Sequence, residues 1–391
     1  MPPLGAGNGC AGRGRAPPRR ERGALRRQDH RRRRGRHRGG VRTARRPGKT
    51  RAGDRERTRA AIRLRARDLR GHVARGVRIR RAALQTIRGR LGMSANVVTA
   101  KKAVIPVAGL GTRLFPASQA VKKELMPVVG PDGIARAMIH YHVSELVAAG
   151  IEDICIVAQP GDEETIRAYF AGPGPDLLRR LEKTPALAEE ARRMREYNAR
   201  LHVVFQREQE GYGHAVFQSR AFAGGEPVLL CLGDHLFRGA PVSPYRELAE
   251  MVGRGGGRSV SAVNRIGPAQ LKGYGTIAGA RRKDFPRLID VTRIVEKPDP
   301  ELARRELRVD GLGADEFLGW FGMHLLAPSI YDVLAQMIRD DVRDNGEFQL
   351  TRAQDLQRAR EGYLALDMPA AERFDFGTPA DYLESLARFA Q

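Results

Sequence analysis

Long apolar runs, paired cysteines and a signal-peptide core are all missing from this 391-residue chain. Since no stretch of 18 apolar residues occurs, the sequence predicts no transmembrane helix and no membrane partner. The cysteines Cys10, Cys155 and Cys231 are too few and too scattered for a disulfide framework or a zinc site. Cys155 and Cys231 lie in apolar, strand-like segments, which indicates small buried side chains. Together these absences predict a cytoplasmic protein.

Aromatic residues and serine are missing from residues 1–92, where acidic residues are also scarce. This segment holds 31 basic and 5 acidic residues, whereas the chain as a whole carries a net charge of +24, so the remainder is nearly neutral at −2. Its apolar residues are too few to offset the entropy of chain ordering. We therefore expect residues 1–98 to form a basic, Arg-rich extension, disordered to about residue 58 and partly helical over 59–92, and residues 99–391 to form the folded domain.

Three interpretations of the extension stay open. A nucleic-acid-binding arm fits the charge, but no aromatic side chain is available for base stacking, so no nucleic-acid partner is expected. An organellar transit peptide should be rich in serine. The third interpretation, which the Arg/Gly/Ala/Pro composition favours, is a start codon assigned too far upstream, with Met93 as the true start.

A glycine-rich loop, residues 109–113 (GLGTR), follows the first strand-like segment at 103–107. Lys122 and Lys123 come about ten residues later. Glycine has no Cβ, so its backbone N–H groups can approach a phosphate closely. The spelling excludes a P-loop, and Leu114 replaces the third glycine of a dinucleotide fingerprint. A strand, a glycine loop and cations predict a polyphosphate site; the alternative is a tight turn with a solvated arginine.

The segment 107–127 resembles the signature of the sugar-nucleotide pyrophosphorylases. It reads V-A-G-x-G-T-R-x-x-P-A and then K-E-x-x-P, and matching pieces recur as far as Gly377. Within that family it is most similar to the bacterial UTP–glucose-1-phosphate uridylyltransferases (UDP-glucose pyrophosphorylases). The resemblance implies catalytic roles for Arg113 and Lys123, and it implies nucleotide binding by four loop residues, Ala108, Gly109, Gly111 and Thr112.

Strand-like and helix-like segments alternate after the glycine loop. Strands are expected at 153–158, 201–205, 227–232 and 317–326, and helices at 135–149, 162–170, 176–198 and 381–389. This alternation predicts an α/β fold with a doubly wound, mostly parallel (mixed) sheet and ligands at the carboxyl ends of its strands. The resemblance implies that this sheet belongs to a Rossmann-like nucleotidyltransferase fold.

A glutamine and a glycine after the third strand are the candidate base-reading residues. Gln206 can both donate and accept hydrogen bonds, which suits the edge of uracil. It lies five residues before G-Y-G-H-A, and the resemblance assigns Gln206 and Gly211 to the base. His214 is expected to cap or pack rather than to take part in the chemistry.

Two aspartates are the candidate metal ligands. Asp234 follows the fourth strand, and a carboxylate there can hold Mg²⁺ together with phosphate oxygens. His235 stands where the family often has a second acidic residue, and imidazole is a poor ligand for hard Mg²⁺. Asp375, in F-D-F-G-T-P, is the candidate second contact; the alternative is a helix N-cap.

The sugar-binding residues are implied by the resemblance. Tyr274 and Gly275 supply a backbone contact, Glu296 of V-E-K-P accepts sugar hydroxyls, and Gly319 permits close approach. Lys297 is the third catalytic residue, a point charge for the sugar phosphate. Neighbouring residues of a strand point to opposite faces, so Glu296 and Lys297 can serve one ligand only if the strand ends or bends there.

The chain departs from the family pattern next to the glycine loop. Ser118 and Gln119 replace Thr-Lys, which removes a cation, and Lys122 replaces a proline before Lys123. Lys122 is a candidate to compensate for the lost charge. The segment 346–351 (GEFQLT) is expected to be structural or a subunit contact, in a homo-oligomer that is a dimer or tetramer.

The resemblance implies Mg²⁺-dependent transfer of a uridylyl group from UTP to glucose 1-phosphate, giving UDP-glucose and pyrophosphate. One alternative is the same chemistry with dTTP or with another sugar 1-phosphate. The other is a non-catalytic regulatory protein of the same fold, in which the phosphate cations and the metal carboxylate would be lost. Arg113, Lys123, Asp234 and Lys297 are all present.

Overall fold

The first strand lies in the middle of the parallel half of the main sheet. A computed structural model describes residues 98–391, so the basic extension and its helix-forming part lie outside the described residues. Strand β1, Lys102–Pro106, is buried along four of its five residues because it pairs in parallel with a strand on each side. Within residues 98–391, no helix is long and apolar enough to cross a membrane.

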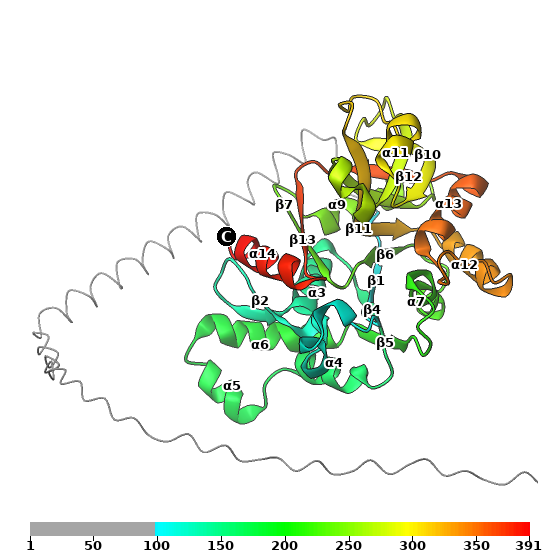
Figure 1. Ribbon diagram of the computed structural model, residues 1–391. Coiled ribbons are helices and arrows are strands. Elements are labelled where there is room, and N and C mark those ends of the chain that lie inside the picture. Colours follow the sequence, from blue (N-terminus) through cyan, green and yellow to red (C-terminus); the bar gives the residue numbers. More distant parts are fainter. Residues whose placement is uncertain (1–97) are drawn as a thin grey trace, which may run out of the picture. The chain divides into compact units, whose positions relative to one another are not determined.

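Nine strands form the main sheet, in the order β5-β4-β1-β6-β11-β8-β12-β10-β9 (Figure 1). Their bounds are β1 Lys102–Pro106, β4 Asp153–Ala158, β5 Leu201–Phe205, β6 Val228–Cys231, β8 Val260–Ile266, β9 Gly275–Arg281, β10 Leu288–Glu296, β11 Phe317–Leu326 and β12 Leu364–Asp367. The four strands from β5 to β6 are parallel, as expected. The other half is mainly antiparallel, because β11 runs against both β6 and β8, and β10 against β12 and β9; only β8 and β12 are parallel there.

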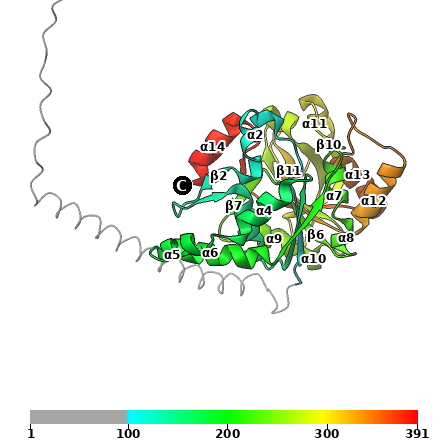
Figure 2. The same cartoon turned by 90° about the horizontal axis from the view of Figure 1, so that it is seen from below.

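Helices cover both faces of the parallel half, which confirms the doubly wound arrangement. Along β1, Ala103 and Ile105 pack on the face covered by α3 (Met138–Ala149) and α9 (Pro244–Ala249). Val104 points to the opposite face, which is covered by three helices, α7 (Tyr212–Phe217), α12 (Ser329–Arg339) and α13 (Leu350–Glu361). The two views place α12 and α13 (orange) across the sheet from α5 and α6 (green) (Figures 1 and 2).

Further helices, 3₁₀ turns and two ribbons complete the fold. The helices are α2 Ala117–Ala120, α4 Asp162–Ala171, α5 Pro175–Leu181, α6 Pro185–Asn198, α8 Arg220–Ala223, α10 Met251–Arg254, α11 Pro300–Glu306 and α14 Pro379–Phe389, with 3₁₀ turns η1 Thr112–Leu114, η2 Lys123–Leu125 and η3 Pro268–Gly273. The two-stranded ribbons are β2 (Pro127–Val129) with β3 (Ala135–Ala137), and β7 (His235–Gly239) with β13 (Ala371–Asp375).

The strands expected at 153–158, 201–205 and 317–326 form with those bounds. The helix expected from residue 135 begins instead at Met138, because residues 135–137 pair with β2 as an edge strand. It ends at Gly150, whose φ of 96° is the left-handed conformation typical of a helix C-cap.

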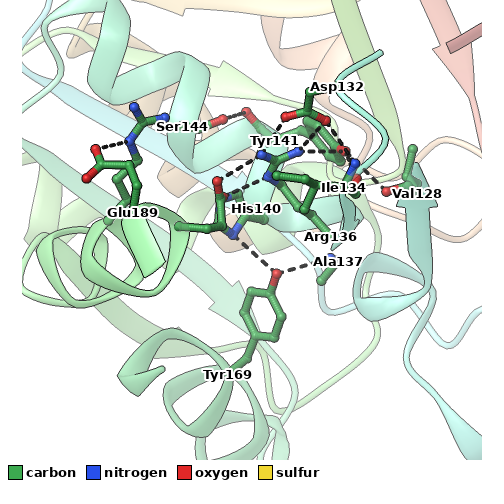
Figure 3. Close-up of polar contacts among 12 residues, drawn as sticks. Val128, Asp132, Ile134, Arg136, Ala137, His140, Tyr141, Ser144, Tyr169 and Glu189 are labelled. Atoms are coloured by element: carbon green, nitrogen blue, oxygen red, sulfur yellow. Dashed lines mark hydrogen bonds and ion pairs between the residues drawn. The ribbon is translucent and has the colours of Figure 1, made fainter. Parts of the chain in front are cut away.

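The charged excursion at 176–198 folds as α5 and α6 and is fastened to the β2–β3 ribbon by a polar network (Figure 3). The Arg136 guanidinium donates to Asp132 at 2.8 Å and to both oxygens of Glu190 at 2.7 and 2.8 Å. Glu190 also contacts His140 Nε2 at 2.7 Å, and His140 Nδ1 lies 3.2 Å from the Tyr169 hydroxyl. The network therefore ties α3, α4 and α6 to the ribbon that follows the glycine loop.

Candidate active site

The glycine loop leaves β1 in a shape that requires glycine. Gly111 has a φ of 65°, and a Cβ there would also come within 3.2 Å of Ser118. Gln159, directly after β4, donates from Nε2 to the carbonyl oxygens of Ala108 at 2.7 Å and Gly109 at 3.3 Å. These two bonds fix the orientation of the loop backbone beside β4. Sequence analysis missed Gln159; its place after a parallel strand was the available signal.

A cavity of about 530 Å³, here called the loop cavity, opens beside the glycine loop. Gly109, Gly111, Lys122 and Lys123 are among its lining residues. Lys122 Nζ contacts Asp162 Oδ2 at 2.7 Å, so its charge is already paired there. Lys122 therefore lines the cavity in which it could compensate for the cation absent at Gln119, but its charge is already paired with a carboxylate.

Lys123 and Arg113, the candidate phosphate-binding cations, converge on Asp234, the candidate metal ligand. Lys123 Nζ donates to Asp234 Oδ2 at 2.8 Å, and Arg113 Nη2 lies 3.8 Å from the same oxygen. The Arg113 side chain is 64% exposed and free to meet a ligand, whereas Asp234 is buried. Burial alone would raise the pKa of the Asp234 carboxyl, but His235 and Lys123 hold that pKa well below its usual range. Thr112 follows in the loop as the first residue of η1.

Glu124 lies beside this cluster and was not assigned a role from the sequence. Its side chain is 2% exposed, and its Oε2 has no hydrogen-bond partner within the described residues. Burial raises the pKa of Glu124 to about 7, although Lys123, 3.6 Å away, acts to lower it. The sequence shows an acidic residue directly after Lys123, but it does not show that this residue is buried.

Asp375 joins the cluster through His235. Strands β7 and β13 pair so that Asp375 lies opposite His235, and His235 bridges Asp234 from Nδ1 at 2.9 Å to Asp375 from Nε2 at 3.1 Å. Asp375 is not a helix cap: it accepts a bond from the Gly377 N–H at 2.8 Å, and Thr378 caps α14. A Cβ on Gly377 would lie 2.7 Å from Arg113 Nη2, so the loop and this turn are in contact.

The two carboxylates suit a hard divalent cation that takes its remaining ligands from phosphate and water. Within residues 98–391, no group of three or more His, Cys, Asp or Glu side chains is arranged to hold a metal ion. The donor set is therefore too small for a structural metal site and fits an ion that arrives with a phosphate ligand. His235 lies between the two carboxylates and contacts both of them.

The candidate base-reading residues lie together at the end of β5. Gln206 is buried, and its Nε2 donates to the Gly211 carbonyl at 3.1 Å and lies 3.3 Å from His214 Nδ1. Gly211 has a φ of 104°, and a Cβ there would clash with Glu347 at 2.7 Å. The G-Y-G-H-A motif is thus packed against Glu347 and Phe348 of the GEFQLT segment.

The candidate sugar-binding residues also lie together. Gly275 pairs with Glu296 across β9 and β10, and Gly319 of β11 is opposite the next residue of β9. Strand β10 ends at Glu296, and Lys297 leaves it with a φ of 48°, which confirms the expected break. The Lys297 side chain is 59% exposed and has Glu296 as its charged neighbour at 3.6 Å.

A second cavity of about 410 Å³, here called the strand cavity, lies beside the sugar-binding residues and Asp375. Tyr274, Gly319, Trp320, Arg373 and Asp375 are among its lining residues. The cavity places the second candidate metal ligand next to two of the candidate sugar-binding residues. Lys297 is not among its lining residues.

Arg373 is a second residue that sequence analysis missed. Burial lowers the pKa of the Arg373 guanidinium to about 10, which leaves it charged at neutral pH. It lies two residues before Asp375 in an alternating strand, and this spacing was the available signal for a charge beside the metal ligand.

Comparison with known proteins agrees with this arrangement. Residues 102–391 match the family model described as "Nucleotidyl transferase". The chain is 32% identical over 292 residues to UTP–glucose-1-phosphate uridylyltransferase 2 of Staphylococcus saprophyticus, covering 74% of this chain and 92% of that protein. It is 30% identical over 290 residues to UTP–glucose-1-phosphate uridylyltransferase 1 of the same organism, with the same coverage.

Comparison with solved structures supports the same family for the fold. A UTP-bound UGPase from Acinetobacter baumannii is 28% identical with a TM-score of 0.60, covering 74% of this chain and 93% of that one. An apo UDP-glucose pyrophosphorylase has a TM-score of 0.63 at 24% identity, covering 74% and 98%. The chain therefore belongs to the nucleotidyl transferase family, in which the relatives named above are UTP–glucose-1-phosphate uridylyltransferases.

Proposed function

We propose that the protein transfers a uridylyl group from UTP to glucose 1-phosphate, giving UDP-glucose and pyrophosphate. The observation that carries the proposal is the convergence of Lys123 and Arg113 on Asp234, at the carboxyl ends of β1 and β6. Two cations and a carboxylate beside a glycine loop suit a triphosphate and its metal ion. The candidate sugar-binding strands reach the same region through the strand cavity that Asp375 also lines.

The chemistry requires no protein nucleophile. An oxygen of the sugar phosphate attacks the α-phosphorus of UTP, the new O–P bond forms as the bond to the β-phosphate oxygen breaks, and pyrophosphate leaves in line. Positioning and charge stabilisation then account for the rate. Ala108, Gly109, Gly111 and Thr112 hold the triphosphate with Arg113. Lys123 neutralises charge at the α-phosphate, and Lys297 holds the incoming sugar phosphate.

Asp234 and Asp375 are the proposed ligands of Mg²⁺, which would neutralise phosphate charge when bound. Carboxylate oxygens match this ion, while His235 offers a nitrogen that it binds poorly. His235→Ala should therefore retain most activity, whereas His235→Asp, which restores an acidic pair, should lower the Mg²⁺ concentration needed for half-maximal rate. A severe loss of activity in His235→Ala would argue that the imidazole is a working ligand.

Gln206 and Gly211 are the proposed base readers. The Gln206 amide nitrogen is occupied by Gly211 and His214, so its Oε1 is the atom available to the base. An acceptor at this point suits the N3–H of uracil and mismatches cytosine, whose N3 is itself an acceptor. Thymine presents the same N3–H, so dTTP stays the competing nucleotide. Glu296, Tyr274, Gly275 and Gly319 are the proposed sugar contacts.

The test is a pyrophosphate-release screen of sugar 1-phosphates against the nucleoside triphosphates. UTP with glucose 1-phosphate should give the highest kcat/KM. A clear preference for dTTP or for another hexose 1-phosphate would support the proposed reaction but show that the substrate is a different one. Absence of pyrophosphate release with every pair would favour the non-catalytic alternative.

We also infer that residues 99–391 are the catalytic domain and that the basic extension is dispensable for catalysis. The family match begins at residue 102, and residues 93–391 are almost neutral in charge, which supports this division. A chain beginning at Met93 should keep wild-type turnover, and loss of folding in it would contradict the division. We further infer a cytoplasmic homo-oligomer, dimer or tetramer, which size-exclusion chromatography with light scattering would test.

A further inference from the structure

The Arg373 side chain stacks on an aromatic ring rather than pairing with a carboxylate. Its guanidinium carbon lies 4.1 Å from the centroid of the Tyr274 ring. Within residues 98–391, no ion pair to Arg373 occurs within 4 Å, although Asp375 and Asp381 line the same cavity. The neighbouring Arg388, by contrast, is paired with Glu372 at 2.5 Å. The stack on Tyr274 is therefore the principal contact of the Arg373 guanidinium.

Tyr274 is held from more than one side. A Cβ at Gly319 would come within 3.2 Å of the Tyr274 Cβ, so the tyrosine packs closely on β11. The Tyr274 carbonyl accepts a hydrogen bond from the Lys297 backbone N–H at 3.1 Å. The same carbonyl accepts from the Thr276 hydroxyl at 3.3 Å, so the ring that Arg373 stacks on and the carbonyl that binds Lys297 belong to one firmly held residue.

Lys297 depends on that hydrogen bond because its backbone is in an unfavourable conformation. A non-glycine residue with a φ of 48° needs support from its surroundings. Its side chain is largely exposed and has no other fixed partner besides Glu296 among the described residues, so the backbone sets where the ammonium group can reach. Arg373 is thus connected to Lys297 by one stack and one hydrogen bond.

We propose that Arg373 is a positioning residue for the sugar phosphate: by stacking on Tyr274 it fixes the carbonyl that holds the backbone of Lys297. The proposal rests on the proposed function, in which Lys297 binds the sugar phosphate. Arg373 and Asp375 lie on the same face of β13. The strand that carries the second candidate metal ligand therefore also orients the sugar-phosphate lysine, which links the two halves of the site.

The test is a double-mutant cycle between Arg373 and Lys297. Arg373→Lys keeps the charge and loses the planar stack, and it should raise the KM for the sugar 1-phosphate roughly 3- to 10-fold, the range expected for a lost cation–π contact. The KM for UTP and kcat should stay within about twofold, since the nucleotide contacts are untouched. In a Lys297→Ala background the same substitution should add less than about twofold, because residues that act through one another are not additive.

A second substitution and a matched control complete the experiment. Tyr274→Leu removes the ring and keeps the carbonyl, and it should reproduce the Arg373→Lys shift in KM. Arg238→Lys is the control: Arg238 stacks on Phe374 at 4.8 Å and pairs with Glu372 but does not itself line the strand cavity, so this substitution should leave both KM values unchanged. Thermal unfolding of each variant shows whether it is folded.

Additive effects in the cycle would mean that Arg373 contacts the sugar phosphate itself, and they would overturn the proposal. If Arg373→Lys raised the KM values for UTP and for the sugar 1-phosphate equally, and Arg238→Lys did the same, the stack would only stabilise the fold. That result would also overturn the proposal. The cycle is run with whichever sugar 1-phosphate the wild type uses best. If the proposed function names the wrong sugar, the wild-type screen will show it. If Arg373 has another role, only the double-mutant cycle will show it.

Discussion

Replacing Glu124 with glutamine should change how the stability of the domain depends on pH. The Glu124 carboxyl is buried beside Lys123, and its Oε2 has no partner within the described residues. Burial raises its pKa from 4.5 to about 7. The folded state then binds a proton that the unfolded state has lost, so the contribution of this carboxyl to stability is full below pH 4.5 and is lost as the pH rises to 7.

The size of the effect follows from the same values. At 1.36 kcal/mol per pH unit, ionising this carboxyl costs the folded state roughly 3 kcal/mol by pH 8. Glu124→Gln keeps the shape and removes the titration, so its free energy of unfolding relative to wild type should rise by about that amount between pH 4.5 and 7.5.

The assay is urea denaturation of wild type and variant across this pH range, without nucleotide or metal. The difference between the proteins is the quantity to use, because burial lowers the pKa values of His142 to about 4 and of His324 to about 3, and those groups add slopes of the opposite sign. Glu226→Gln is the control, since that carboxylate is 53% exposed and pairs with Lys102. A wild-type-minus-variant difference that is flat with pH would refute the reasoning.

Three further predictions concern the proposed chemistry. Asp234→Asn should abolish pyrophosphate release while circular dichroism stays native, and Asp375→Asn should raise the Mg²⁺ concentration needed for half-maximal rate. Lys297→Ala should mainly raise the KM for glucose 1-phosphate and Lys123→Ala should mainly lower kcat, each by about 2–4 kcal/mol in transition-state binding. Gln206→Ala should lower kcat/KM for UTP by about 1–3 kcal/mol with little change for glucose 1-phosphate, because a buried base edge loses its partner.

Each of these predictions has a contrary outcome. An active Asp234→Asn enzyme with ordinary Mg²⁺ dependence would sink the metal assignment. Near-normal kinetics of both lysine variants with both substrates would mean that the phosphates bind elsewhere. If the Gln206→Ala variant preferred UTP by the same margin as wild type, the loop backbone around Ala108 and Gly211, and not Gln206, would select the base.

Much of the fold could be predicted because local pattern and long-range pairing agree there. The strand at 153–158 is apolar and buried from Ile154 onward and lies between two parallel strands, so its position follows from hydrophobicity. Residues 135–137 show the limit: they have helical spacing, but they pair with β2, a contact that no local pattern records. The antiparallel half of the sheet was equally hidden, since strand direction depends on which strand becomes the neighbour.

The residues of the site likewise fall into those that the sequence identifies and those that only the fold reveals. Motif spelling led to Arg113, Lys123 and Asp234, and the fold brings both cations within 4 Å of Asp234. Arg373 was not recoverable from spelling, because its importance comes from a ring far away in the sequence, that of Tyr274. The unpaired oxygen of Glu124 likewise depends on burial, which a K-E dipeptide does not reveal.

Strand β11 has a consequence for how the two halves of the sheet are joined. All ten of its residues are buried; its final four residues pair with β6, and Phe317–Trp320, His324 and Leu325 pair with β8. Its register with β8 shifts between Trp320 and His324, and Gly322 within that shift has a φ of 97°. A bulge bends its strand and increases the local twist, so β11 changes direction at this point. The Gly322 carbonyl accepts a hydrogen bond from the Leu232 N–H at 3.0 Å, and β8 pairs with β11 on both sides of the shift, so the antiparallel half of the sheet is held at a fixed angle to the parallel half.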